Sequence, residues 1–352
     1  MRSGELAQIG WDIGGAHVKA AAVDPHGRVV AALQVPCALW RGLDQLESAL
    51  EQALAGMPPG ATHAHHAVTM TGELADLFAD REQGVRRIVE TLQRRCGSAH
   101  LSVFAGERGF LDPQQALKVA GSVASANWLA TAQLIASRIG EALLVDIGST
   151  TTDLVAIHDG RVGASGRTDF ARLVSGELVY SGVVRTALMA IADAIEFEGL
   201  RVPLMAEQFA TTADVYRLTG ELDERCDQHA SADGAEKTPQ ASARRLGRMI
   251  GCDAHERPLE TWQTLAASFR VTQLERIRRA AQQVLLRAAV APAGVLVAAG
   301  SGAFLVPELA RALRRPAVAF ARLVVSTLDD PTLIGVCAPA VSVAMLAQRA
   351  NR

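Results

Sequence analysis

Two short acidic turns stand out in the chain because both recur in the same sequence context. "WDIGG" places Asp12 behind an apolar run, and "VDIGSTTTD" places Asp146 behind a second one. The two aspartates lie 134 positions apart (146 − 12), and Gly-Arg-Val follows each at nearly the same distance. Backbone N–H groups at such a turn can bind phosphate, and the carboxylate can bind Mg²⁺. We therefore expect each turn to hold one side of a metal-bound diphosphate.

The groups that would surround this diphosphate are the glycines and hydroxyls of the two turns. Glycine lets the backbone approach an anion closely, and hydroxyls donate to phosphate oxygens. The candidates are Gly14, Gly15, Gly148, Ser149, Thr150, Thr151 and Thr152. Lys19 and Asp153 occupy equivalent positions (19 + 134 = 153). Lys19 could neutralise a phosphate and Asp153 could bind the metal through water, or both could be solvated hairpin charges.

A third glycine motif lies late in the chain, in "VAAGSGAFLVPEL". Gly300, Ser301 and Gly302 follow an expected strand and precede an expected helix. Backbone there could approach a phosphate group or a flat ring, although tight packing at a strand–helix turn explains the same glycines. The order of the three motifs is more specific than any one of them.

Four further residues could contact a substrate. Glu73 is a candidate general base and Thr71 a neighbouring contact, unless the two form a helix N-terminus with Thr71 as its cap. Asn127 could be a helix cap or a ligand. Arg217 could meet a substrate carboxylate or an intrahelical partner. The histidines of "THAHH" have no partner at metal-ligand spacing, so we expect no metal cluster there.

Two α/β halves must position these residues. Each half opens with a strand, a glycine turn, a second strand and a hairpin, which indicates a duplicated fold. We expect helices over 43–55, 85–96, 127–139, 306–313 and 331–349, and a last strand over 322–328. Residues 1–139 form the first predicted lobe, to which a helix at 331–352 returns. Residues 140–330 form the second, with a helical insert over about 183–290 and a solvated polar excursion that includes Glu236 and Lys237.

Composition narrows the partners to small molecules. Of 352 residues, 49% are hydrophobic and 20% charged, and a net charge of −2 gives no reason to expect nucleic acid or a membrane surface. Glycines and prolines interrupt both long uncharged runs, and the N-terminus lacks a secretory signal pattern. The five cysteines are scattered without a CxxC pair, which favours a reducing cytoplasm. A homo-oligomer is possible.

With these motifs in order, the chain resembles the actin-like ATPase superfamily over nearly its whole length. "WDIGG" and "VDIGSTTTD" look like its two phosphate motifs, and "AAGSG" like its nucleoside-side motif. "DIGSTTTDLVAI" is most similar to the hydantoinase A/oxoprolinase group. "HAVTMTGELADLF" and "VPLMAEQFATTADVYRLTG" resemble a compact branch linked to tetrahydromethanopterin-dependent one-carbon transfer.

The resemblance implies a two-lobed actin-like α/β fold, with the turns of Asp12 and Asp146 facing one another across a cleft. It also implies a methanofuran-type transferase that joins a furfuryl diphosphate to a phenol and releases diphosphate with Mg²⁺. Two alternatives stay open: an ATP-dependent amidohydrolase or kinase, and a nucleotide-binding protein without turnover. His17 departs from the asparagine expected at this position of the family.

Overall fold

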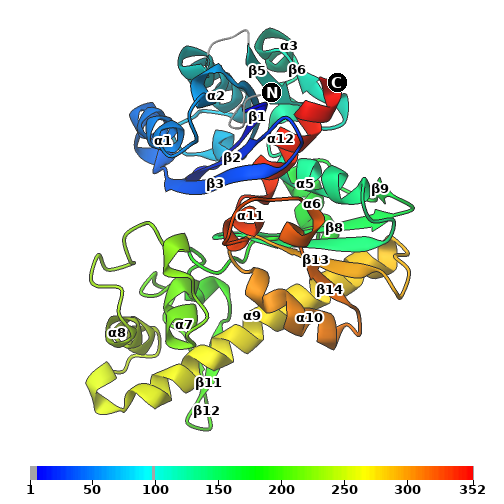
Figure 1. Cartoon of the computed structure of the whole chain (residues 1–352). Helices are drawn as coiled ribbons and strands as arrows, with labels where there is room; N and C mark the ends of the chain where they lie inside the picture. Colours follow the sequence, from blue (N-terminus) through cyan, green and yellow to red (C-terminus); the bar gives the residue numbers. More distant parts are fainter. Residues whose placement is uncertain (1–5, 97–99, 352) are drawn as a thin grey trace. The chain divides into compact units, whose positions relative to one another are not determined.

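The computed structural model describes residues 6–96 and 100–351 and divides the chain into two compact units (Figure 1). Unit 1 comprises Met1–Ala142, Ile157–Gly163 and Val318–Arg352, and unit 2 comprises Leu143–Ala156 and Ala164–Ala317. The first five residues, on which the absence of a secretory signal partly rests, lie outside the described residues, as does the last residue of the predicted closing helix.

Unit 1 is built on a six-stranded sheet of order β3-β2-β1-β4-β5-β6. Its strands are β1 (Gln8–Ile13), β2 (His17–Val23), β3 (Val29–Pro36), β4 (His65–Met70), β5 (Leu101–Phe104) and β6 (Phe110–Leu111). β1 pairs with β2 in antiparallel and with β4 in parallel orientation. The carboxyl ends of β1 and β4 therefore meet at the same edge.

Helices cover both faces of this sheet. They are α1 (Leu43–Ala55), α2 (Arg81–Cys96), α3 (Pro113–Leu117), α4 (Ala120–Val123), α5 (Asn127–Ala136), α11 (Thr332–Val336) and α12 (Ala338–Ala350). Trp11, Ile13 and Val68 alternate toward a core that α1 and α2 complete. On the opposite face, α12 lies against β1, where a Cβ at Gly10 would overlap the Ala340 carbonyl oxygen. Gly10 therefore permits this close approach.

The second sheet, most of which belongs to unit 2, has the order β10-β8-β7-β13-β14, and β9 pairs with β8. Its strands are β7 (Ala142–Ile147), β8 (Thr152–His158), β9 (Arg161–Val162), β10 (Leu178–Val179), β13 (Val295–Ala299) and β14 (Ala317–Ala319). The helices of unit 2 are α6 (Asp169–Ser175), α7 (Thr212–Leu218), α8 (Pro239–Met249), α9 (Leu259–Arg287) and α10 (Val306–Ala312). Short 3-10 turns connect these elements, at Leu39–Arg41, Ala61–His63, Gly72–Leu74, Gly106–Arg108, Leu188–Ala190, Glu224–Cys226, Ala254–Glu256, Ala303–Leu305 and Phe320–Leu323.

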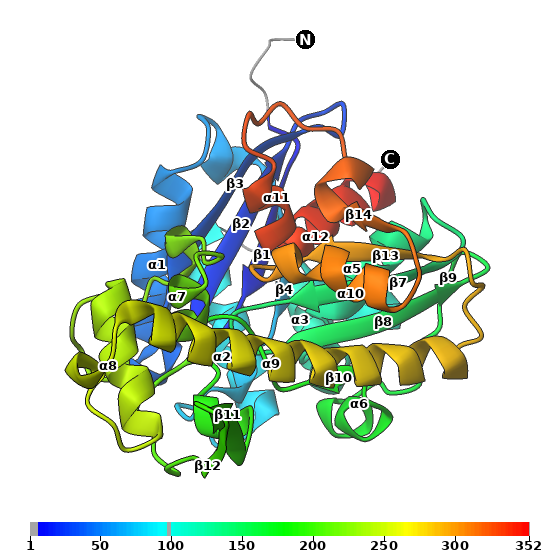
Figure 2. The same cartoon turned by 90° about the horizontal axis from the view of Figure 1, so that it is seen from below.

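The long helix α9 organises the insert of unit 2 (Figure 2). It contacts α7, α8 and α10, and its Trp262 and Phe269 join a second buried core with Leu246 of α8. The insert is not wholly helical, because β11 (Ala194–Phe197) and β12 (Leu200–Pro203) form an antiparallel hairpin in it.

The last part of the chain differs from the prediction in two places. Residues 322–328 form no regular strand: Ser326 makes a single bridge to Val29 before the Asp-Asp-Pro turn ends the extended run. The predicted closing helix is divided into α11 and α12 at Cys337, because Pro339 starts a new helix at its first turn.

Candidate functional site

The first predicted turn closes with one short hydrogen bond. The Gly14 N–H donates to the His17 carbonyl oxygen over 2.9 Å. The chain that follows β3 then covers the outside of the turn: the Cys37 N–H binds the Ala16 carbonyl over 2.8 Å. Burial raises the pKa of the Cys37 thiol to about 12, so this residue supplies no thiolate nucleophile beside the turn.

The strand register gathers polar side chains around Asp12. Lys19 of β2 and Thr69 of β4 are its direct cross-strand partners, so all three project from the same face of the sheet. The Asn127 side-chain amide reaches the Asp12 carboxylate from α5 over 3.4 Å. Asp12 is 4% exposed. Sequence reasoning missed Thr69, whose link to Asp12 depends on the register of β4 against β1.

Asn127 is the first residue of α5, not its cap, which is Ala126. The side-chain oxygen Oδ1 of Asn127 accepts a hydrogen bond from the Trp128 backbone N–H. The NH₂ group of the same side chain can therefore point toward Asp12. The cap role is therefore excluded, the contact of Asn127 with Asp12 is within the protein, and its role as a substrate ligand stays a prediction.

Thr71 and Glu73 lie directly after β4. The Thr71 N–H donates to the Ile13 carbonyl over 2.9 Å, but the Thr71 hydroxyl makes no cap hydrogen bond to the 3-10 turn that follows. Glu73 is buried, at 1% exposure, and accepts a 2.8 Å hydrogen bond from the hydroxyl of Ser125. Ser125 has a φ of 51°, a left-handed conformation that is unusual for serine. Sequence reasoning did not identify Ser125 as a partner of Glu73.

The second predicted turn repeats the first. The Gly148 N–H donates to the Thr151 carbonyl over 2.8 Å, and the chain after β10 covers the outside of the turn. Val183 N–H binds the Gly148 carbonyl, and Val184 and Arg185 N–H bind that of Ser149, at 3.0, 3.1 and 2.8 Å.

The carbonyl of Thr150 is held in the same way, by the Thr186 hydroxyl at 3.3 Å. In a trans peptide the N–H points opposite to the C=O, so the N–H groups of Ser149, Thr150 and Thr151 point away from this covering chain. None of these three N–H groups has an acceptor within the described residues. Three adjacent donors without an acceptor are the kind of arrangement that anion-binding backbone turns use.

Two side chains of the second turn make contacts within the protein. The hydroxyl of Thr152 is buried and donates to the Ser181 carbonyl over 2.6 Å. The Asp153 carboxylate accepts from the buried guanidinium of Arg172 over 2.8 Å. Their predicted roles in phosphate and metal binding stay predictions.

The third motif lies against Asp146, which is 8% exposed at the end of β7. Gly300 follows β13 with a φ of 80°, and a Cβ there would overlap the Ile147 carbonyl and the Asp146 carboxylate. The Gly302 N–H donates to the same Ile147 carbonyl over 2.7 Å. Ser301 lies between these glycines and is partly exposed. Glycine is needed here because backbone packs directly beside the carboxylate.

Arg217 belongs to a buried ionic network of the insert. Its guanidinium donates to Glu224 over 2.8 Å and lies 3.7 Å from Asp214, the expected intrahelical partner. Arg217 therefore binds protein carboxylates in the structure, as the intrahelical alternative expected, and its contact with a substrate carboxylate stays a prediction. In the same network, Lys237 pairs with Asp227 at 3.1 Å, so it is not the solvated lysine that the sequence predicts.

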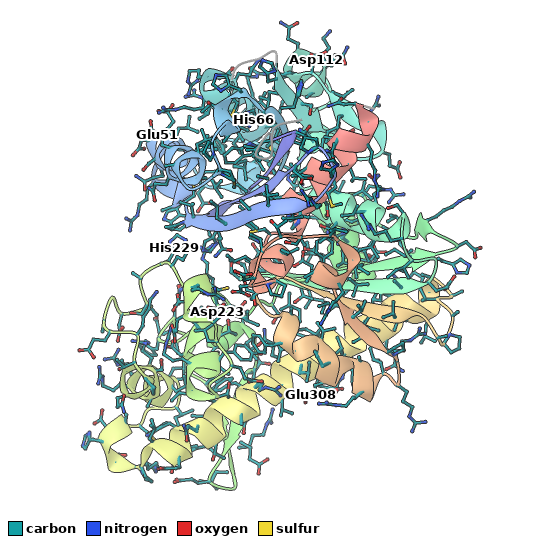
Figure 3. All side chains as sticks on the ribbon, in the orientation of Figure 1. Glu51, His66, Asp112, Asp223, His229 and Glu308 are labelled. Carbon is teal, nitrogen blue, oxygen red and sulfur yellow. The ribbon has the colours of Figure 1, made fainter. Side chains whose placement is uncertain are left out.

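His66 of the histidine run has a structural explanation. His66, which is labelled in Figure 3, is fully buried in unit 1. It accepts a 3.0 Å hydrogen bond from the indole N–H of Trp11. Burial, together with the nearby His100 and His65, lowers the pKa of His66 to about 4. A neutral histidine in this position is a packing group.

Comparison with known proteins identifies the family to which this chain is similar. A model described as hydantoinase/oxoprolinase matches residues 65–347, a range that includes the second turn and the third motif but not the first turn. The chain is similar to "(4-{4-[2-(gamma-L-glutamylamino)ethyl]phenoxymethyl}furan-2-yl)methanamine synthase" of Methanocaldococcus jannaschii. The two are 33% identical over 246 residues, 70% of this chain and 72% of that one.

A protein of the same name from Methanococcus vannielii is 35% identical over 32% of this chain and 51% of its own length. Among solved structures, nucleotide-free acetone carboxylase covers 85% of this chain and 66% of its own, with a TM-score of 0.55 and 11% identity. The predicted actin-like α/β fold is thereby confirmed. Within the described residues, no helix combines the length and the hydropathy that crossing a bilayer requires.

Proposed function

Because this chain belongs to the hydantoinase/oxoprolinase family, we propose that it is a transferase of methanofuran-type cofactor synthesis. In this proposal it joins an aminomethylfuran-methyl diphosphate to a phenolic, tyramine- or tyrosine-derived acceptor and releases diphosphate. The observation that carries the proposal is the 33% identity to the Methanocaldococcus jannaschii synthase over 70% of this chain. The name of that relative describes a phenoxymethyl furan, which is the ether such a transfer would form.

The proposed reaction exchanges one carbon–oxygen bond for another. The phenolate oxygen attacks the furan methylene carbon, a new ether bond forms, and the bond from that carbon to the diphosphate oxygen breaks. The leaving diphosphate takes the electron pair, and the phenol proton passes to a base. Negative charge grows on the diphosphate in the transition state, so donors aimed at it would lower the barrier.

The geometry of the second turn supports a role in binding that diphosphate. The N–H groups of Ser149, Thr150 and Thr151 point to one side, and the partly exposed hydroxyls of Ser149 and Thr150 lie beside them. In our proposal the first turn contributes Gly14 and Gly15 to the same ligand, and Lys19 neutralises a phosphate.

Magnesium is proposed with the diphosphate. The proposed ligands suit this ion, because Asp12 and Asp146 are carboxylates near the ends of their strands. Gly300 has no Cβ, so its backbone lies close to the Asp146 carboxylate. When bound, Mg²⁺ would supply positive charge to the departing diphosphate. Asp12 and Asp146 would hold it, and Asn127 would orient Asp12.

We propose Glu73 as the acceptor of the phenol proton. In support, the preceding residue, Gly72, packs against the first turn: a Cβ on Gly72 would lie 3.1 Å from the Ile13 carbonyl oxygen. Ser125 fixes one oxygen of the Glu73 carboxylate. We also propose a cytoplasmic location, which the five free thiols support.

The test is to supply the purified protein with the furfuryl diphosphate, Mg²⁺ and γ-glutamyltyramine, and to measure ether and diphosphate together. Equal amounts of both are expected, with neither formed without the acceptor. A parallel reaction contains ATP and no furan substrate. Steady ATP hydrolysis there, without ether formation in the first reaction, would replace this proposal by an ATP-dependent amidohydrolase or kinase.

A further inference from the structure

The second turn depends on a short segment that is distant in sequence. Residues 181–186 follow β10, and within the part of the chain that the structure describes they supply the donors that hold the carbonyls of Gly148, Ser149 and Thr150. Gly182 packs so closely on the turn that a Cβ there would overlap the Ser149 carbonyl carbon and the Thr150 nitrogen. The direction of the three N–H donors therefore depends on where this segment lies.

One buried side chain of the insert fixes that segment. Gln273, in the middle of α9, is 1% exposed, and its NH₂ group donates to the Ser181 hydroxyl and to the Gly182 carbonyl, both over 2.8 Å. These contacts join α9 to residues more than ninety positions earlier in the chain. No other side chain in the described part of the molecule donates to the Gly182 carbonyl.

A tyrosine sets the direction of this amide. The Tyr216 hydroxyl of α7 donates to the Gln273 carbonyl oxygen over 2.7 Å, which leaves the NH₂ group facing Ser181 and Gly182. Tyr216 is fully buried and its ring contacts Phe304, two residues after the third motif. Burial raises the pKa of Tyr216, so its hydroxyl stays a donor throughout the working range of pH.

The helix that carries Gln273 is itself anchored nearby. Arg270, about one turn earlier in α9, donates to Glu221 after α7 and to Glu308 of α10, each over 2.8 Å. Glu308 is labelled in Figure 3. These ion pairs hold the part of the insert that carries Gln273 beside the segment that covers the turn.

We propose that Gln273 is a positioning residue, which aims the anion-binding N–H groups of Ser149, Thr150 and Thr151 by holding Ser181 and Gly182. Tyr216 assists by fixing the orientation of its amide. The insert thereby takes part in diphosphate binding without touching the ligand. This inference depends on the proposed function only in one respect, the identification of the bound anion as diphosphate.

The central test is Gln273→Met, which keeps the length of the side chain but removes its amide. It leaves the Gly182 carbonyl and the Tyr216 hydroxyl buried without a partner, an effect large enough to loosen the segment. Hydrogen exchange of the amides in 148–152 and 181–186 should become about tenfold faster. The Kd of the Mg²⁺ complex of inorganic diphosphate should rise about tenfold. Tyr216→Phe should give a smaller change of the same kind.

Ile277→Val is the matched control, because it removes one buried methyl group from the same helix, one turn away. It should lower Tm but leave the exchange of 148–152 and the diphosphate Kd within twofold of wild type. Equal effects of Gln273→Met and Ile277→Val on these two quantities would overturn the inference, as would unchanged exchange in Gln273→Met.

Gln273→Glu adds a readout that a merely structural residue would not give. Near neutral pH the new carboxylate faces the Gly182 carbonyl and cannot donate to it. Burial raises the pKa of such a carboxyl group, so lowering the pH toward 5 restores a donor. The ratio of its diphosphate Kd to that of wild type should fall as the pH is lowered. A wild type that releases no diphosphate would refute the proposed function, while the exchange data would still decide the role of Gln273.

Discussion

Gly14 and Gly148 close their turns with the same hydrogen bond, to the carbonyl three residues later. The backbone that follows the neighbouring strand, β4 beside β1 and β13 beside β7, returns in both halves to an equivalent carbonyl. Thr71 N–H binds Ile13, and Gly302 N–H binds Ile147. The repeat therefore extends from the acidic turn to the residues that lie beside each aspartate.

At Gly300 this close approach leaves no room for a side chain. Gly300→Ala forces a residue with a Cβ into a φ of 80° and against the Asp146 carboxylate. We expect a loss of roughly 1–3 kcal/mol in the free energy of unfolding, and slower diphosphate release. Urea unfolding and the diphosphate assay measure the two effects.

Gly335→Ala is the control, because no atom beyond its chain neighbours and its own helix backbone lies within 4 Å of a Cβ there, and alanine favours a helix. It should be neutral or stabilising. Equal stability and activity in both variants would contradict the assigned role of Gly300.

His66 makes the stability of unit 1 dependent on pH. Its pKa is about 4 in the folded chain, against 6.5 for an ordinary histidine, so the unfolded chain binds the proton more readily. The contribution of the neutral His66 ring to the free energy of unfolding is fully present above pH 6.5. It falls as the pH drops from about 6.5 to about 4, by up to about 3 kcal/mol.

The free energy of urea unfolding, measured from pH 7 to pH 4, checks this prediction. His66→Gln can still accept from the Trp11 indole N–H but does not titrate. Its unfolding free energy should lose less over this range than that of wild type. Parallel pH curves for the two proteins would show that His66 does not titrate as described.

At the residue scale, the sequence predicted the backbone of the site better than its side chains. The Asp-Ile-Gly repeat located both turns, since a strand end followed by glycine is a local signal. Thr69, Ser125 and Gln273 could not be found in this way, because each acquires its role from register or from packing between distant segments. The ion pair of Asp153 depends in the same way on Arg172, which lies on another element.

Elements with strong periodicity were predicted well. The helix over 43–55 is found with both its ends, and α2 begins only a few residues before the predicted start. The β11–β12 hairpin was missed because Glu198 and Gly199, with φ of 51° and 78°, form a turn whose first residue is not a typical left-handed one. Local sequence indicates a regular element reliably only where the turn chemistry agrees with it.

The insert of unit 2 depends on buried charge. Arg245 is fully buried and contacts Asp214 at 2.7 Å and Asp233 at 3.0 Å, which ties α8 to α7 and to the polar excursion. Arg245→Met leaves the Asp214 carboxylate without one of its donors. We expect a loss of roughly 3–5 kcal/mol in the free energy of unfolding.

The control is Arg257→Met, which breaks a partly exposed pair with Glu198 on the same unit. Exposed pairs contribute little, so its unfolding curve should stay close to that of wild type. Denaturant unfolding of both variants measures the free energy that each substitution removes. If Arg245→Met were no more destabilising than Arg257→Met, the excursion would not be held by its buried charges.

At the scale of the whole molecule, the duplication explains why the chain contains two acidic turns. Each sheet presents an aspartate at the end of a strand, a glycine turn closed by the same hydrogen bond, and a neighbouring strand that ends beside it. The family model matches from residue 65 onward, so the first turn is assigned from this repeat and not from the family match. The fold class could be predicted from sequence because the repeat consists of short local motifs. The lobe boundaries at 139/140 and 330/331 remain predictions.

The central claim is that both aspartates act on one Mg²⁺–diphosphate. The measurement that tests it most directly is the turnover of wild type, Asp12→Asn and Asp146→Asn in the diphosphate release assay, with Mg²⁺ titrated for each. Each substitution keeps the shape of the side chain but removes a charge from the proposed metal site. We expect kcat to fall about 100-fold or more in both variants, with higher Mg²⁺ needed for half-maximal rate and little change in Tm. Near-normal turnover with unchanged Mg²⁺ dependence in both variants would contradict the account, and loss in only one would leave the other turn without a catalytic role.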